Sequence, residues 1–219
     1  MSFVIALDGP AAAGKGTLAR RLAERYRLAY LDTGSLYRGV GLAVMRQALD
    51  PSTESAAITA AEHLDPAILA DPAIRSERGG QAASKVGAIP AVRQALLNWQ
   101  RHFAAHPPAG PDGQAQAGAI LDGRDIGTVV CPDAAVKLFV TASTEARAQR
   151  RFKELQEKGA GVIYARVLQD MQERDARDQE RAVAPMLPAA DALVIDTSAL
   201  TADQVFDLAV AHIDRILAR

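Results

Sequence analysis

Residues 3–17 of the chain read FVIALDGPAAAGKGT, and this stretch decides the fold. The apolar run Phe3–Leu7 ends at Asp8-Gly9, which predicts a short buried strand of a parallel sheet. A loop of small residues follows, and helical spacing of apolar residues begins at Thr17. This order of strand, glycine-rich loop, lysine and helix is typical of a phosphate-binding P-loop. The alternative, a glycine-rich turn that binds nothing, is disfavoured by the same order of elements.

The chemistry of such a loop follows from its backbone. Small residues let the chain wrap closely around phosphate oxygens, and the helix N-terminus adds partial positive charge. Lys15 is expected to bridge the β- and γ-phosphates of a nucleoside triphosphate. Gly16 stands where Ser or Thr usually binds Mg²⁺, so we expect Mg²⁺ to be held mainly by phosphates and water, and Thr17 to donate to an α- or β-phosphate. The expected nucleotide-binding residues are Gly9, Pro10, Ala11, Ala12, Ala13, Gly14, Lys15, Gly16 and Thr17.

Apolar runs alternate with helical patterns along the rest of the chain. Further strands are predicted at Leu28–Leu31, Ala119–Leu121, Ala135–Thr141 and Ala192–Ile195. Helices are predicted at 17–26, 34–49, 90–105, 143–158, 162–181 and 201–217, with a loop at 106–118. The stretch Ser52–Ile89 reads as helical pieces broken at Pro66, Pro72 and Gly79-Gly80. We expect a three-layer α/β/α fold with a five-stranded parallel sheet.

Bulk composition excludes several classes of protein. The chain has 219 residues, 49% hydrophobic and 23% charged, enough for one sizeable core with an appended lid or subdomain. A net charge of −1 gives no global attraction to nucleic acid or an anionic membrane. One cysteine, Cys131, excludes an internal disulfide, and the four histidines lack metal-ligand spacing. Without a signal peptide pattern or a bilayer-spanning run, we expect a cytoplasmic protein, and without an apolar seam a monomer.

Two polar motifs follow predicted strands. The motif 32–38 (DTGSLYR) comes after the second strand, and Asp122-Gly123-Arg124-Asp125 follows the third. Both are expected at the carboxyl edge of the sheet, where ligands bind in this architecture. Arg38 and Arg124 suit phosphate, and Asp125 suits a polar base edge. The alternatives are a helix N-cap beside an exposed Arg38 and a local surface ion pair at Arg124.

A third group of charged residues lies on a predicted helix. Arg174, Asp178 and Arg181 are spaced by four and three residues, which places them on one face, with Arg177 close by. Beside a P-loop, such a helix suits a lid whose arginines neutralise charge on a transferred phosphoryl group. The alternative is a solvated helix laced with ion pairs, because acids are interspersed at Glu173, Asp175 and Glu180.

A P-loop alone leaves the reaction open, since ATPases, GTPases and small-molecule kinases share it. Five stretches make the pattern more specific: DGPAAAGKGT, LDTGSLYR, AASKVGAIPAVRQALL, LDGRDIGTVVCPDA and ERDARDQERAVAPMLPAADALVIDTS. In these stretches and their order the chain resembles the bacterial cytidylate kinases. The resemblance implies transfer of the γ-phosphate of ATP, with Mg²⁺, to CMP or dCMP, so that the partners are small-molecule nucleotides. Rival hypotheses are a kinase acting on UMP, AMP or shikimate, and a nucleotide-dependent switch.

The resemblance also implies domains and site residues. It implies one P-loop kinase domain over 1–219, containing a helical acceptor-binding subdomain at roughly 33–105 and a short lid at 159–182. Arg38 and Arg124 would grip the acceptor phosphate, and Arg174 and Asp178 would lie near the sugar and the transferred phosphate. The implied CMP-binding residues are Thr33, Tyr37, Arg38, Ser84, Arg93, Arg124, Asp125, Arg174, Asp178 and Arg181. The implied catalytic residues are Lys15, Arg38, Arg124, Arg174 and Arg181, with no protein metal ligand.

The chain also departs from the family pattern. The family typically carries a long β-rich insert in its acceptor-binding subdomain, whereas Ser52–Gly80 is expected to be shorter and helical. The 106–118 loop is longer than the usual connection before the third strand.

Overall fold

The computed structural model describes residues 3–157, 159 and 161–218, which fold as two compact units. The first unit is built from residues 1–31 and 104–219, and the second from residues 32–103. Each unit has its own hydrophobic core. The phosphate-binding loop lies in the first unit.

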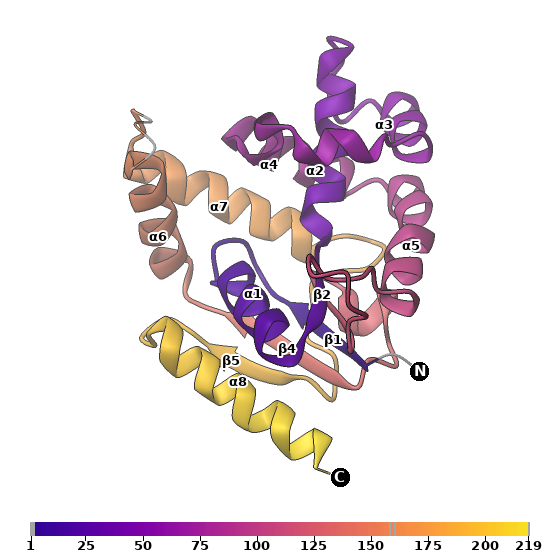
Figure 1. Ribbon diagram of the computed structural model, residues 1–219. Helices are drawn as coiled ribbons and strands as arrows, with labels where there is room; N and C mark the ends of the chain where they lie inside the picture. The colour runs from indigo at the N-terminus through magenta and orange to yellow at the C-terminus, as the bar shows by residue number, and fades with distance from the viewer. Residues whose placement is uncertain (1–2, 158, 160, 219) are drawn as a thin grey trace. The chain divides into compact units, whose positions relative to one another are not determined.

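The predicted five-stranded parallel sheet is confirmed (Figure 1). Its strand order is β2-β3-β1-β4-β5. Central β1 pairs in register with β3 from Phe3 opposite Gly118 to Asp8 opposite Gly123. The register therefore sets the start of the P-loop beside the turn that follows β3. The strands are β1 Phe3–Asp8, β2 Leu28–Asp32, β3 Gly118–Gly123, β4 Val136–Thr141 and β5 Leu193–Asp196.

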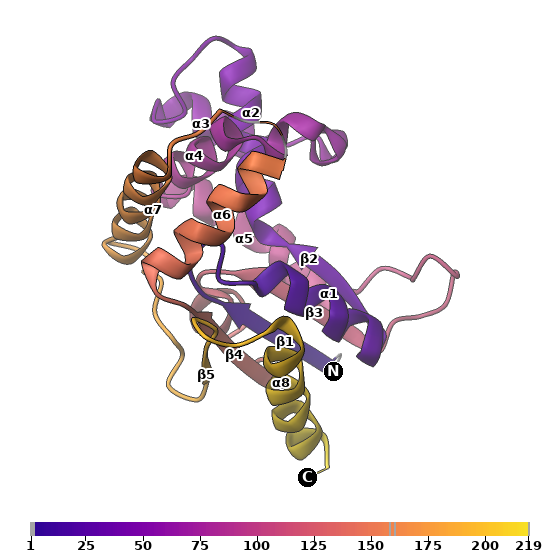
Figure 2. The same cartoon turned by 90° about the vertical axis from the view of Figure 1, so that its left-hand side faces the viewer.

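Helices of the first unit cover the sheet and extend beyond its carboxyl edge. Leu22 of α1 and Ile213 of α8 are fully buried in one cluster with Ile5 and Leu138 of the sheet, so α1 and α8 cover the same face (Figures 1 and 2). Helices α6 and α7 pack along each other. The helices are α1 Lys15–Tyr26, α6 Thr144–Glu157, α7 Tyr164–Gln179 and α8 Ala202–Leu217, with a π-helix, η3, at Ile126–Val130.

Apart from Asp32, which ends β2, the regular secondary structure described in the second unit is helical. Leu36, Val40 and Val44 of α2 form its core with small and apolar residues of the neighbouring helices. Close packing of α2 on α4 needs glycine, because a Cβ at Gly41 would lie 2.6 Å from the Cβ of Ala82. The elements are α2 Thr33–Arg46, α3 Glu54–Glu62, η1 Pro66–Ala70, η2 Pro72–Arg75, α4 Glu77–Val86 and α5 Pro90–Ala105, whose end belongs to the first unit.

The structure corrects two of the predicted helix boundaries. The break predicted at Gly79-Gly80 is wrong: α4 runs through both glycines, and the hydroxyl of Ser76 caps it by accepting from the N–H of Gly79 at 3.0 Å. The helix predicted to reach Arg181 ends at Gln179. The breaks at Pro66 and Pro72 are confirmed, and the predicted α6 end at Lys158 lies outside the described residues.

Candidate active site

The P-loop joins β1 to α1 through a sharply curled backbone. Gly9 has a φ of +139°, and a Cβ there would lie only 1.9 Å from the carbonyl oxygen of Val140 in β4. Ala12 and Gly14, the N-cap of α1, both adopt left-handed conformations. Such turns direct successive N–H groups to one side, which suits an anion. This geometry agrees with the loop predicted from the sequence.

The P-loop lysine is buried and held across the loop. Lys15 is 5% exposed, and its Nζ donates to the carbonyl oxygen of Pro10 at 2.8 Å. The same Nζ lies 3.7 Å from Oδ1 of Asp122 at the end of β3. The register of β1 and β3 thus brings the lysine of the first motif to the first carboxylate of the second.

Asp8 links β1 to the segment after β3 through hydrogen bonds. Its two carboxylate oxygens accept hydrogen bonds from the N–H groups of Ile126 and Gly127, each at 2.8 Å. Burial raises the pKa of Asp8 to about 7, although both hydrogen bonds and the nearby Lys15 act in the opposite direction. Since η3 begins at Ile126, directly after Arg124 and Asp125, this carboxylate shapes the turn that carries them.

The second and third sequence motifs meet at Asp178 of α7. Nε of Arg124 donates to Oδ2 of Asp178 at 3.0 Å, and Arg181 pairs with Oδ1 of the same carboxylate. Asp178 is 2% exposed. Burial alone would raise its pKa, but Arg124, Arg181 and Arg174 together hold that pKa below its usual range. Three arginines around one carboxylate leave surplus positive charge, which suits a phosphate group.

The position of Arg181 corrects the prediction that Arg174, Asp178 and Arg181 share one helix face. Arg181 follows the end of α7, whose C-cap is Glu180. Its contact with Asp178 is nevertheless kept, because the chain turns directly after the helix and Met186 donates its N–H to the carbonyl of Asp178 at 2.9 Å.

The second unit carries the other acceptor-binding residues predicted from the resemblance. Thr33 of α2 and Ser84 of α4 are buried on helices that pack against each other. Arg93 is also buried; its guanidinium lies 5.4 Å from the ring centroid of Tyr37 and donates to the carbonyl of Gly87 at 3.2 Å. Arg38 donates to the carbonyl of Ile74 at 2.9 Å, so it is more than an exposed residue beside an N-cap. Buried polar groups of this kind are costly unless they are satisfied, and they favour a built site over a solvated surface.

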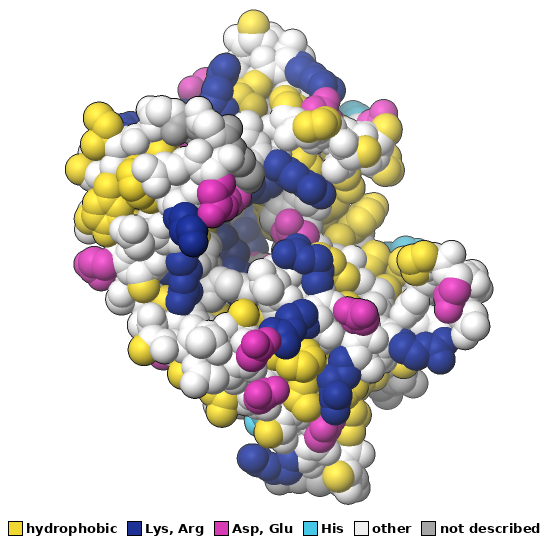
Figure 3. Space-filling model, turned by 60° about the vertical axis from the view of Figure 1, so that its left-hand side comes forward, with side chains coloured by type: hydrophobic (Ala, Val, Ile, Leu, Met, Phe, Trp, Pro, Cys, Tyr) yellow, Lys and Arg dark blue, Asp and Glu magenta, His cyan; other side chains and the backbone are white. Residues whose placement is uncertain are grey.

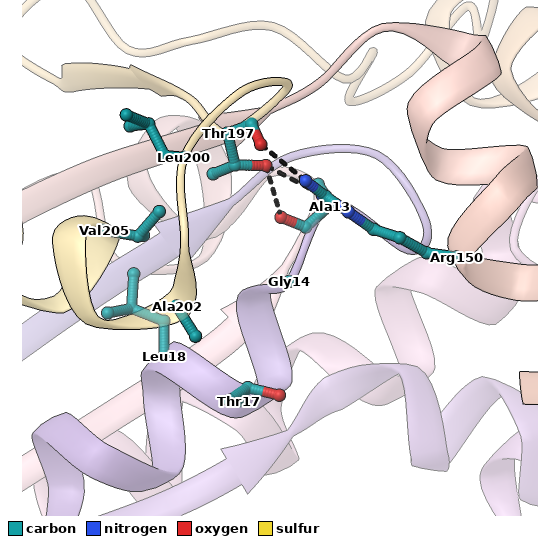
Figure 4. Close-up of a pocket in the computed structure, with 9 residues that line it drawn as sticks. All are labelled: Ala13, Gly14, Thr17, Leu18, Arg150, Thr197, Leu200, Ala202 and Val205. Atoms are coloured by element: carbon teal, nitrogen blue, oxygen red, sulfur yellow. Dashed lines mark hydrogen bonds between the residues drawn. The ribbon is translucent and has the colours of Figure 1, made fainter.

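A pocket of about 220 Å³ beside the P-loop includes two polar residues that the sequence analysis missed (Figure 4). Arg150 of α6 donates to the hydroxyl of Thr197 at 3.0 Å and to its carbonyl at 2.5 Å. The Thr197 hydroxyl lies 3.1 Å from the carbonyl oxygen of Ala13 in the P-loop. The only sequence signal was the place of Thr197 just after β5, at the carboxyl edge of the sheet. The lining residues are Ala13, Gly14, Thr17, Leu18, Arg150, Thr197, Leu200, Ala202 and Val205.

The part of the chain that the structure describes contains neither a metal-binding cluster nor a membrane-spanning helix. No group of three or more His, Cys, Asp or Glu side chains there is arranged to hold a metal ion. In the same residues, every helix is too short or too polar to cross a bilayer. On the face drawn in Figure 3, basic and acidic side chains are interspersed.

Together, the P-loop after β1, the sheet order and the arginines around Asp178 are features of the P-loop phosphotransferases. Within that class, the chain belongs to the cytidylate kinase family, whose model matches residues 5–215. It is 61% identical to the cytidylate kinase of Paramagnetospirillum magneticum over 97% of this chain and 98% of that protein. It is 60% identical to the cytidylate kinase of Rhodospirillum rubrum over 95% of each chain. Both matches thus extend over nearly the whole of each chain.

Solved structures of low sequence identity support the fold alone. A shikimate kinase from Bacteroides thetaiotaomicron matches with a TM-score of 0.50, 13% identity and complete coverage of both chains. An uncharacterised protein from Eubacterium ventriosum matches with a TM-score of 0.51 and 14% identity over 97% of this chain and 98% of that one.

Proposed function

We propose that this protein is an ATP-dependent CMP and dCMP kinase that forms CDP or dCDP and ADP. The family match over residues 5–215 supports the reaction. The observation that carries the proposal is the cluster of Arg124, Asp178 and Arg181 in the same unit as the P-loop. A triphosphate donor needs the loop, and a second phosphate needs these arginines.

ATP occupies the P-loop and the pocket beside it. The N–H groups of residues 9–17 and Lys15 bind the phosphates, and the pocket formed with Arg150 and Thr197 takes the adenine ring. Its apolar wall of Leu18, Leu200 and Val205 suits a flat base, and Arg150 and Thr197 supply the polar groups that orient it.

Mg²⁺ fits this site as a companion of the nucleotide. The Asp122 carboxylate lies 3.7 Å from Nζ of Lys15. Thr17 carries the hydroxyl group of the loop sequence 9–17. With these few protein oxygens, Mg²⁺ would be held mainly by ATP phosphates and water. The chemistry it would supply is neutralisation of charge on the β- and γ-phosphates.

The acceptor-binding subdomain, roughly residues 33–105, recognises the pyrimidine nucleotide. Cytosine offers an amino donor and two acceptors, which hydroxyl, carboxylate and guanidinium groups can match. The base-binding residues proposed in that unit are Thr33, Ser84 and Arg93, all of them buried. In the first unit, the residues proposed to bind the base are Asp125 and Arg181. Tyr37 packs against Arg93 and completes the same set. Arg38 and Arg124 are proposed to bind the acceptor phosphate, and Arg174 and Asp178 to lie near the sugar and the transferred phosphate.

Catalysis comes from positioning and charge neutralisation. The CMP phosphate oxygen is already a nucleophile at neutral pH, so the in-line transfer needs no general base. Lys15, Arg38, Arg124, Arg174 and Arg181 neutralise the charge that develops on the transferred phosphoryl group. Closure of the lid, residues 159–182 with Arg177, excludes water and suppresses hydrolysis of ATP.

Nucleotides are the only partners the reaction needs. We infer a cytoplasmic monomer, because both substrates are cytoplasmic metabolites and the exposed hydrophobic residues are scattered over several elements.

The test is ADP formation from Mg-ATP, measured without an acceptor and then with CMP, dCMP, UMP, AMP and shikimate in turn. We expect strong stimulation by CMP or dCMP. Acceptors that leave the pocket's hydrogen-bonding groups unpaired should be rejected by about 10⁴-fold. Equal stimulation by AMP or shikimate would overturn the acceptor assignment. Hydrolysis that no acceptor stimulates would overturn the kinase reaction and favour a nucleotide-dependent switch.

A further inference from the structure

The guanidinium group of Arg147 in α6 is buried and completely hydrogen-bonded. It is 3% exposed. Nε donates to the carbonyl of Ala142 at 2.9 Å, and Nη2 to the hydroxyl of Thr144 at 3.0 Å. Nη1 donates to the carbonyl of Ala11 in the P-loop at 3.4 Å. The remaining two N–H groups bind both carboxylate oxygens of Asp175, at 3.1 and 2.5 Å. All five N–H groups of the side chain are therefore used within the protein.

This pattern separates Arg147 from the arginines proposed to bind phosphate. A guanidinium with five satisfied donors has none left for a nucleotide. Arg147 instead connects two segments, because its Nη1 donates to both Ala11 of the P-loop and Asp175 of α7. Asp175 directly follows Arg174 and lies one turn before Asp178, both of which are proposed to contact the substrate.

Packing alone does not fix α7 at this place. Within the first unit, α7 packs mainly along α6. A polar cavity of about 420 Å³ separates the C-terminal half of α7 from the carboxyl end of β4 and from Pro10. Arg147 and Asp175 form part of the wall of that cavity. An ion pair with two parallel hydrogen bonds fixes orientation as well as distance.

We infer that Arg147 and Asp175 are positioning residues that hold α7 in register with the P-loop, so that Arg174 reaches the transferred phosphoryl group. The inference rests on the proposed kinase reaction. A displacement of about 1 Å at a reacting centre can cost roughly 100-fold in rate. The pair therefore acts on catalysis through Arg174, without touching the substrate itself.

The chain supplies a matched control on the same helix. Asp170 pairs with Arg166 at 3.1 Å near the start of α7, and the Arg166 side chain is 67% exposed. Asp175→Asn and Asp170→Asn thus make the same chemical change in a buried ion pair and in a pair whose arginine is exposed. We expect Asp175→Asn to lower kcat for CMP phosphorylation by about 10- to 100-fold, with the Kd for an ATP analogue changed less than about threefold. Asp170→Asn should keep wild-type turnover. Equal kcat values in the two variants would overturn the inference.

A second measurement excludes a purely structural role. If Asp175 acts through Arg174, Asp175→Asn should cost less than about threefold in an Arg174→Ala background, although it costs 10-fold or more alone. If the fold losses of the two single variants multiply in full in the double variant, the pair does not act through Arg174.

Should Asp175→Asn fail to fold, the charge-balanced double variant Arg147→Met/Asp175→Leu replaces it, because an apolar pair often restores stability. Turnover at the wild-type level in that variant would contradict positioning.

Hydrogen exchange separates failure of this inference from failure of the proposed function. Asp175→Asn should speed amide exchange in residues 164–179, and Asp170→Asn should leave the C-terminal half of α7 unchanged. This readout needs no substrate. A wild-type protein that does not phosphorylate CMP would refute the kinase reaction whatever the exchange shows. Unchanged exchange in an active enzyme would refute the positioning role alone.

Discussion

At the residue scale, Arg124 is the side chain on which the proposed reaction depends most directly. It reaches from the turn after β3 to Asp178, and it is not part of the P-loop. Removal of its guanidinium should therefore leave ATP binding intact while the acceptor phosphate loses its main positive partner. We predict that Arg124→Ala lowers turnover by about 10³-fold or more, as removal of other transition-state arginines does.

The check on Arg124 combines CMP-dependent ADP formation with the Kd of an ATP analogue. Arg166→Ala, on the exposed part of α7, is the control for loss of one arginine. Wild-type turnover in Arg124→Ala would contradict the role proposed for this residue. A large loss of ATP affinity would instead move Arg124 to the donor side of the reaction.

Gly9 lies where the backbone leaves no room for a side chain. An alanine there would be strained at a φ of +139°, and its Cβ would lie 1.9 Å from a carbonyl oxygen of β4. We predict that Gly9→Ala lowers the free energy of unfolding by about 2–4 kcal/mol, from backbone strain and overpacking together. Gly113→Ala is the matched control, because Gly113 also has a positive φ but no atom within 4 Å of its would-be Cβ. Urea denaturation should show a loss of about 1 kcal/mol or less for the control; equal losses would refute the steric argument.

At the element scale, strands and long helices could be predicted from the sequence because their signals are local. The run Phe3–Leu7 and its closing Asp8 define β1 by themselves, and Pro90 marks the first turn of α5. The break at Gly79-Gly80 was wrong for a tertiary reason. A Cβ at Gly79 would lie 2.6 Å from the carbonyl of Ile74, so this glycine permits η2 to pack on α4 and does not end a helix.

The residues of the candidate site likewise include some that local sequence patterns predict and some that they do not. The P-loop, Arg124 and Asp178 could be predicted because each lies in a long motif. Arg147 and Asp175 could not, because they are separated by 28 residues and lie among many other charges. The π-helix η3 also depends on a distant partner, since Asp8, 118 residues away, accepts the N–H of Ile126. Sequence patterns report neighbours along the chain, whereas these contacts are set by the sheet register.

The link between β1 and η3 should be visible in the pH dependence of stability. The pKa of Asp8 is raised to about 7 in the folded protein, mainly by burial. Asp8 therefore favours the folded state fully only below its unfolded pKa, and this contribution is lost as the pH rises through about 7. Relative to Asp8→Asn, the wild-type free energy of unfolding should fall between pH 4 and pH 7, by up to about 4 kcal/mol. Denaturation curves at several pH values measure the difference; parallel pH profiles for the two proteins would contradict it.

At the scale of the whole molecule, the two units divide the proposed chemistry between them. The P-loop lies in the unit that contains the sheet, whereas Thr33, Tyr37, Ser84 and Arg93 lie in the helical unit of residues 32–103. Each unit has its own core, Ile5 and Leu138 belonging to one and Leu36 and Val86 to the other. A ligand that binds one set of residues should therefore slow hydrogen exchange mainly at the amides of that unit.

Hydrogen exchange with single ligands tests this division. A non-hydrolysable ATP analogue should slow exchange in residues 9–17, because their N–H groups bind phosphate. CMP alone should slow exchange in 33–38 and 84–93, since the buried Thr33, Ser84 and Arg93 are proposed to bind the base. Shikimate, which lacks a base and a phosphate, is the control and should protect neither set. Protection by CMP confined to residues 9–17 would mean that the acceptor competes for the donor site and that the helical unit does not recognise cytosine. Protection of 33–38 and 84–93 by CMP but not by AMP would place the choice of base in that unit.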